Sequence, residues 1–117
     1  MIHRPRGLNS VADWVCNLIL DEGADEFCWI NPDFVFVPEG WVAAYSDGAY
    51  RSSGCGSASC GAVIEFHIDK PEPASVIVAV KGLRLSGCAD SFLAEAEGAI
   101  VAMELLVDVF KNTTLWN

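Results

Sequence analysis

Apolar residues recur at helical spacing near the start of the chain. Four of them share one face of a helix over residues 10–20: Val11, Val15, Leu18 and Ile19. Asn9 or Ser10 is suited to cap the start of this helix, and Gly23 is suited to end it. The pattern therefore predicts an amphipathic helix close to the N-terminus.

Residues 23–40 carry no comparable period and read as an acidic connector, with Asn31-Pro32 and Pro38-Glu39-Gly40 as turn signals. Within it, the apolar run at 34–37 suggests a short extended piece. From residue 41 the pattern becomes that of strands, which are predicted at 41–47, 60–68 and 75–85. Their short connections imply an antiparallel three-stranded meander.

A long helix is predicted at about 91–110, capped by Asp90 or Ser91. Its apolar side chains lie nearly all round the helix, which predicts that it is mostly buried against the sheet. They are Phe92, Ala96, Ala99, Ile100, Met103, Leu106, Val107 and Phe110. The order of elements, with helices and strands in one short chain, indicates a small α/β fold.

Composition narrows the class of protein. The chain has 117 residues, of which 52% are hydrophobic, so it is one small domain or a piece of a larger one. Its net charge is −9, from 16 acidic and 7 basic residues, and such a chain binds phosphate backbones poorly unless its cations are focused or metal ions intervene.

Targeting signals and disulfides are not indicated by the sequence. No run of 18 uncharged apolar residues is present, and the N-terminal residues make a poor signal peptide, so no contact with a membrane is expected. The five cysteines are odd in number and irregularly spaced. They favour reduced thiols in an intracellular protein.

Two carboxylates stand out along the chain. Asp47 lies at the predicted end of the first strand, where Gly48 would permit an abrupt turn, and Glu95 lies among alanines early in the long helix. If that helix packs on the meander, the two carboxylates would face each other and suit a hard divalent cation, Mg²⁺ or Mn²⁺. The alternative is that Asp47 is a turn residue and Glu95 a solvated helix acid.

The ordered motifs resemble those of a known family. PEGWVAAYSDGAY, a Gly-rich loop, CGAVIEF and FLAEAEGAIVAMELL follow one another in residues 38–111, as in the first half of a type 1 ribonuclease H domain of the retroelement and plant-type variety. The resemblance implies an incomplete ribonuclease H-like α/β fold. It also implies that Asp47 and Glu95 are the first two metal-binding carboxylates, and that the ancestral activity is two-metal hydrolysis of RNA in RNA–DNA hybrids.

The N-terminal segment HRPRGLNSVAD resembles the closing segment of the same family, in which a His precedes Asn-x-x-Ala-Asp. This resemblance implies that His3 is the mobile histidine that assists proton transfer or product release, and that Asp13 is the final metal-binding carboxylate. The alternatives are a terminal histidine without a role and a helix acid favoured by the macrodipole.

Three segments follow from this interpretation. Residues 1–22 correspond to a closing helix, 23–40 to the acidic connector and 41–117 to the first half of a ribonuclease H-like domain. This order of segments can arise in two ways. The chain is either a window across two consecutive domains, with the end of one and the start of the next, or a single domain that is circularly permuted. We favour the window, in which the first helix lacks its native partners and packs elsewhere or not at all. In the permuted case, Asp13 joins Asp47 and Glu95.

The resemblance also shows what is missing. A third catalytic carboxylate is expected near residue 117, where Asn117 stands, and we expect the isolated chain to be inactive. The sheet is expected to keep an exposed edge, which favours homodimers or aggregation. A competing interpretation is a non-enzymatic acidic interaction module or a half-domain. Such a half-domain would need a complementing chain or a neighbouring domain of a polyprotein.

Overall fold

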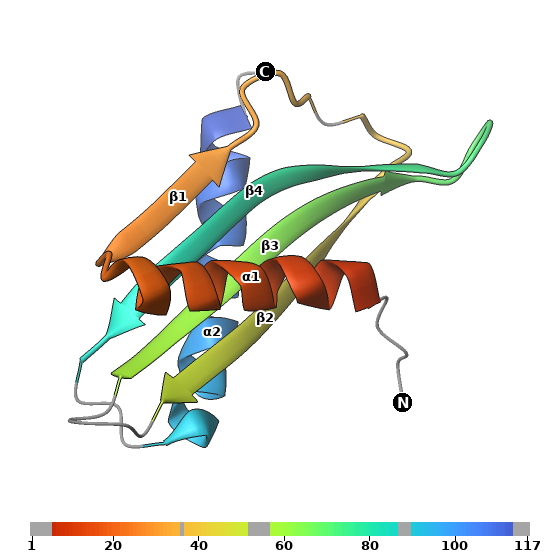
Figure 1. The fold of residues 1–117 in the computed structure, drawn as a ribbon. Coiled ribbons are helices and arrows are strands. Elements are labelled where there is room, and N and C mark those ends of the chain that lie inside the picture. Colours follow the sequence, from red (N-terminus) through yellow and green to blue (C-terminus); the bar gives the residue numbers. More distant parts are fainter. Residues whose placement is uncertain (1–5, 36, 52–56, 87–89, 114–117) are drawn as a thin grey trace.

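The computed structural model describes residues 6–35, 37–51, 57–86 and 90–113. Along the chain the elements are α1 (Arg6–Glu22), β1 (Glu26–Ile30), β2 (Trp41–Arg51), β3 (Ser57–Ile68), β4 (Ala74–Leu85) and α2 (Ser91–Thr113). The strands form one antiparallel sheet in the order β1-β4-β3-β2. One helix lies on each face of this sheet, as Figure 1 shows.

The three predicted strands and their antiparallel meander are confirmed. Strand β3 pairs with β2 on one side and with β4 on the other, from Trp41 opposite His67 to Ala58 opposite Leu85. All three strands are longer than predicted. The largest difference is in β2, which continues past Asp47 to Arg51 because residues 47–51 keep their pairing with β3.

A fourth strand was not predicted. Strand β1 lies inside the segment interpreted as a connector and pairs antiparallel with β4, with Glu26 opposite Leu83. Its residues alternate weakly between exposed and half-buried, so the two-residue period that marks a strand is faint. Of the extended piece predicted at 34–37, the described residues Phe34, Val35 and Val37 lie outside every helix and strand.

The limits of α1 differ from the prediction at one end. The helix is already formed at Arg6, so Asn9 and Ser10 lie inside it and neither caps its start. Gly23 ends the helix as predicted, with a φ of 69° and an N–H that donates to the carbonyl of Ile19 at 3.1 Å. A left-handed glycine at this position is a common helix stop.

Helix α1 packs on the sheet of its own chain, which contradicts the expectation that it packs elsewhere. Ala12, Val15 and Ile19 are fully buried, and Ala12 and Val15 form a core with Val63 and Val80 of the strands. Helix α1 approaches β3 closely because Gly61 of this strand lies beneath the helix. A Cβ on residue 61 would lie 2.4 Å from Cγ1 of Val15.

The opposite face of the sheet carries α2 and the larger core. Cys60, Ile64 and Phe66 of β3 meet Leu105 and Val109 of the helix there. The prediction that α2 is mostly buried is wrong, because the side of the helix that faces away from the sheet is exposed. The apolar residues lie all round α2, so some of them remain outside this core.

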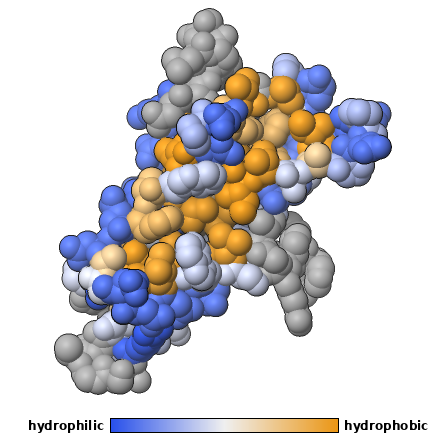
Figure 2. Space-filling model, turned by 45° about the horizontal axis from the view of Figure 1, so that its top comes forward, coloured by the Kyte–Doolittle hydropathy of each residue, from blue (hydrophilic) through white to orange (hydrophobic). Residues whose placement is uncertain are grey.

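Apolar side chains also reach the surface elsewhere. Figure 2 shows hydrophobic side chains gathered in a band across the middle of the molecule, with hydrophilic side chains on both sides of it. Trp14, Trp29 and Trp41 are each about half exposed. Trp14 nevertheless joins α1 to β1 through an edge-to-face contact with Phe27, with ring centroids 6.2 Å apart. The sheet is thus covered incompletely by its two helices.

Candidate functional site

Asp47 lies in the middle of β2, opposite Gly61 of β3. The prediction that the strand ends at Asp47 and that Gly48 makes a turn is wrong, because Gly48 pairs with Cys60 and the strand runs on. The Asp47 side chain is half-buried, and its Oδ1 accepts a hydrogen bond from the N–H of Gly48 at 2.9 Å. Its carboxylate is thus held on the sheet itself.

Both helices hold the backbone of Asp47. From α1, the Cys16 thiol donates a hydrogen bond to the Asp47 carbonyl at 3.4 Å. From α2, Gly98 lies so close that a Cβ there would stand 2.7 Å from the same carbonyl oxygen. That distance is shorter than side chains tolerate, so a glycine at 98 is what lets α2 approach Asp47.

The carboxylates of Asp13 and Glu95 act on Asp47. Burial raises the pKa of Asp47 above its ordinary value, and the hydrogen bond from Gly48 lowers it. The negative charge of Asp13, a side-chain hydrogen bond with Asp13 and the negative charge of Glu95 each raise this pKa further. The charges of Asp13 on α1 and of Glu95 on α2 therefore both act on the carboxyl of Asp47 on β2.

Helix α1 packs against β2 of its own chain, which is what the permuted arrangement predicts and the arrangement we favoured does not. Asp13 lies on α1 and Glu95 in the early turns of α2, and both side chains are exposed. Neither Asp13 nor Glu95 is needed to form a turn or to cap a helix. Helices α1 and α2 pack against β2 from the two faces of the sheet, so Asp47 lies between the elements that carry Asp13 and Glu95.

The Cys16 thiol beside Asp47 is kept in its protonated form. Burial, together with the charges of Asp47 and Cys60, raises its pKa to about 12. A protonated thiol can serve as the donor to the Asp47 carbonyl, whereas a thiolate cannot. In the part of the chain that the structure describes, Cys16, Cys28 and Cys60 are not joined in disulfides.

The carboxylates near Asp47 are of the kind that binds a hard cation, but they do not form a complete coordination site. Carboxylate oxygens are the ligands that Mg²⁺ and Mn²⁺ prefer, and the two charges that act on Asp47 are both negative. Within residues 6–35, 37–51, 57–86 and 90–113, however, no three His, Cys, Asp or Glu side chains stand close enough to hold a metal ion. His3 and Asn117 lie outside the described residues.

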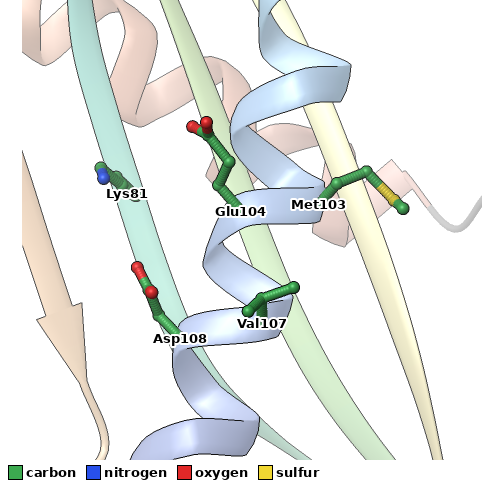
Figure 3. A pocket seen from close by; sticks show the side chains of 5 residues that line it. All are labelled: Lys81, Met103, Glu104, Val107 and Asp108. Carbon is green, nitrogen blue, oxygen red and sulfur yellow. The ribbon is translucent and has the colours of Figure 1, made fainter.

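Two cavities lie away from these carboxylates. One, of about 440 Å³, is lined by Lys81 of β4 and by Met103, Glu104, Val107 and Asp108 of α2. In Figure 3, the carboxylates of Glu104 and Asp108 extend from α2 toward β4, where Lys81 is, while Met103 extends to the other side of the helix. This group of residues was not predicted from the sequence, although acids four residues apart on a helix could have indicated it.

The second cavity is apolar and has a volume of about 520 Å³. It lies between the segment before β2, the start of β2 and the last turns of α2. Its lining residues are Val37, Pro38, Gly40, Trp41, Val42, Phe66 and Phe110. This cavity was not predicted from the sequence, because its walls come from separate elements.

Comparison of this chain with models of protein families, with curated proteins and with solved structures gives no match. Of the helices that the structure describes, neither has the length and the apolar character needed to cross a membrane.

Proposed function

We propose that this chain is part of a ribonuclease H-like nuclease and that Asp47, Glu95 and Asp13 are its metal-binding carboxylates. The observation that carries the proposal is the packing of α1 and α2 against β2, which brings the backbone of Glu95 close to Gly48 and lets the charges of Asp13 and Glu95 act on the Asp47 carboxyl. The four-stranded antiparallel sheet with a helix on each face is compatible with such a fold.

The roles of the three carboxylates follow from their positions. The Asp47 carbonyl accepts a hydrogen bond from the Cys16 thiol and its carboxylate accepts one from the N–H of Gly48, so Asp47 is the fixed ligand. Asp13 and Glu95 are exposed, so their side chains are free to adjust toward a cation between them and Asp47. A bound Mg²⁺ or Mn²⁺ would supply activation of a water and stabilisation of the leaving oxygen of the RNA strand.

Metal binding tests this proposal directly. Calorimetric titration with Mn²⁺ is expected to give weak binding to the chain, and the variant Asp47→Asn is expected to lose it. Asp33→Asn is the matched control, since it removes the same charge from an exposed residue outside the cluster. Identical heats from the original chain and from Asp47→Asn would exclude the metal site.

The substrate class has its own test. The acidic chain should bind a fluorescent RNA–DNA hybrid only when Mn²⁺ is present, because the cations offset its charge of −9. Binding should exceed that of a DNA duplex, since the 2′-hydroxyls and the shape of the hybrid distinguish it. Fluorescence anisotropy measures both. Cleavage by the isolated chain is not expected.

A second candidate function is that of a non-enzymatic acidic interaction module. The exposed apolar side of α2 favours it, because monomeric soluble proteins rarely leave such a surface open. This alternative predicts neither Mn²⁺ binding nor hybrid binding, so the two experiments above distinguish it from the nuclease proposal.

A further inference from the structure

An apolar stripe with a regular spacing runs along α2, mostly on its exposed side, with Leu106 half-buried against the core. Its six members are separated alternately by four and three residues, which is the spacing of a coiled-coil seam. We refer to it as the α2 stripe; its members are Phe92, Ala96, Ala99, Met103, Leu106 and Phe110. Phe92 is 75% exposed and Met103 is 64% exposed, so the described chain does not cover them.

The area of this surface is that of an interface. Large apolar side chains on the exposed side of α2, including Phe92, Ile100 and Met103, together expose roughly 500–800 Å², at roughly 150–250 Å² for each full side chain. The largest apolar patch on a typical monomer is about 300–600 Å². A standard interface buries about 800 Å² on each partner. The α2 stripe and its neighbours therefore approach what one side of a stable dimer requires.

The stripe is complementary in size to itself. When α2 is placed antiparallel to α2 of a second copy about a two-fold axis at residue 101, positions whose numbers are symmetric about 101 face each other. Ala99 then faces Met103 of the second copy, and Ala96 faces Leu106. A small residue meets a large one in both layers, which is how side chains of adjacent helices interdigitate.

The apolar cavity lies at the end of the same stripe. In the antiparallel arrangement Phe92 faces Phe110 of the second copy, and Phe110 lines the cavity of about 520 Å³. The cavity is within the range of volumes that enclose a bound group. Phe92, which is the most exposed large apolar residue among those described on α2, is the side chain that would enter it.

We propose that two copies of this chain associate through the α2 stripe, with the helices antiparallel and Phe92 of each copy seated beside Phe110 of the other. The inference does not depend on the nuclease proposal. Each copy carries a charge of −9, so the association strengthens as salt screens the repulsion between the copies.

Sedimentation equilibrium over micromolar to millimolar concentrations tests the association. The expected mass is twice 12.6 kDa, with a shift toward dimer as salt rises. Met103→Glu and Phe92→Glu should each give the mass of one chain. The matched control is Val35→Glu, which places the same charge on an exposed apolar residue outside the stripe and should leave the dimer intact. A single-chain mass at every concentration, or dissociation by the control as well, would overturn the proposal.

Crosslinking tests the antiparallel register independently of stability. In a background with Cys28, Cys55 and Cys88 replaced by serine, Ala99→Cys and Met103→Cys are prepared as separate variants. Oxidation of their mixture should give mixed dimers, whereas neither variant alone should crosslink to a comparable extent. Equal crosslinking within each single variant, or none in the mixture, would contradict the register.

Discussion

Replacing Gly61 with alanine tests whether α1 belongs on this sheet. A Cβ at this position would lie 2.4 Å from Cγ1 of Val15 and 2.7 Å from the carbonyl oxygen of Ala12. The Val15 side chain can rotate, but the Ala12 oxygen is part of the helix backbone. The added methyl group can therefore be accommodated only if α1 moves away from β3.

The expected loss follows from this overpacking. Inserting a carbon into a well-packed core costs about 1–3 kcal/mol. For a domain of this size the loss corresponds to a fall in Tm of roughly 4–12 °C. The direction of the change in stability is informative, because an alanine that fits without strain stabilises a protein by about 0.4–1 kcal/mol relative to glycine.

Thermal unfolding followed by circular dichroism measures the effect. Ala44→Val is the control, since it enlarges an exposed side chain on the neighbouring strand and should change the unfolding free energy by less than about 0.5 kcal/mol. Gly61→Ala combined with Val15→Ala should lose less stability than the two single losses added together, because one of the close contacts is removed. An unchanged or raised Tm for Gly61→Ala would refute the packing of α1 over Gly61.

Three further predictions concern the surroundings of Asp47. At pH 8, iodoacetamide should modify the exposed Cys28 in the native protein but not Cys16, whose pKa of about 12 keeps it protonated; peptide mass spectrometry compares the two. The raised pKa of Asp47 means that the folded state binds a proton more tightly than the unfolded chain. Urea unfolding should therefore show stability falling as pH rises from 3.8 through the raised pKa, and Asp47→Asn should lose this fall and exceed the original chain at pH 7. Ser59→Ala removes a buried hydrogen bond of 2.7 Å to the carbonyl of Cys16 and should cost about 1–3 kcal/mol by the same measurement; a loss near zero would mean that the carbonyl is solvated.

Strong patterns of hydrophobic residues predicted the strands and the long helix because local spacing alone carries that information. The strand-forming apolar runs and the turn residues between 41 and 85 were sufficient for β2, β3 and β4. Strand β1 escaped prediction since it owes its existence to an open edge of β4, which is a tertiary property. The end of β2 was misplaced for a related reason: Asp-Gly is a turn signal locally, yet the partner strand keeps it extended.

The surroundings of Asp47 were predicted only in part. That α2 lies close to this part of β2 could be predicted because a long apolar helix must lie on the meander. The place of α1 could not be predicted from its own stripe, which shows that the helix needs a cover but not which surface supplies it. The place of α1 is decided by glycines inside the strands, above all by Gly61. The role of its missing side chain can be recognised only once the position of the helix is known.

The order of α1 and its partners along the chain has a consequence for synthesis. The helix leaves the ribosome before the strands that cover it, since Val63 and Val80, which pack against Val15, follow only after a long stretch of chain. Until β4 has emerged, the apolar side of α1 has no sheet to pack on, and contacts between residues so far apart form late and slowly. The nascent chain is thus expected to present an uncovered amphipathic helix to chaperones until β4 has been made.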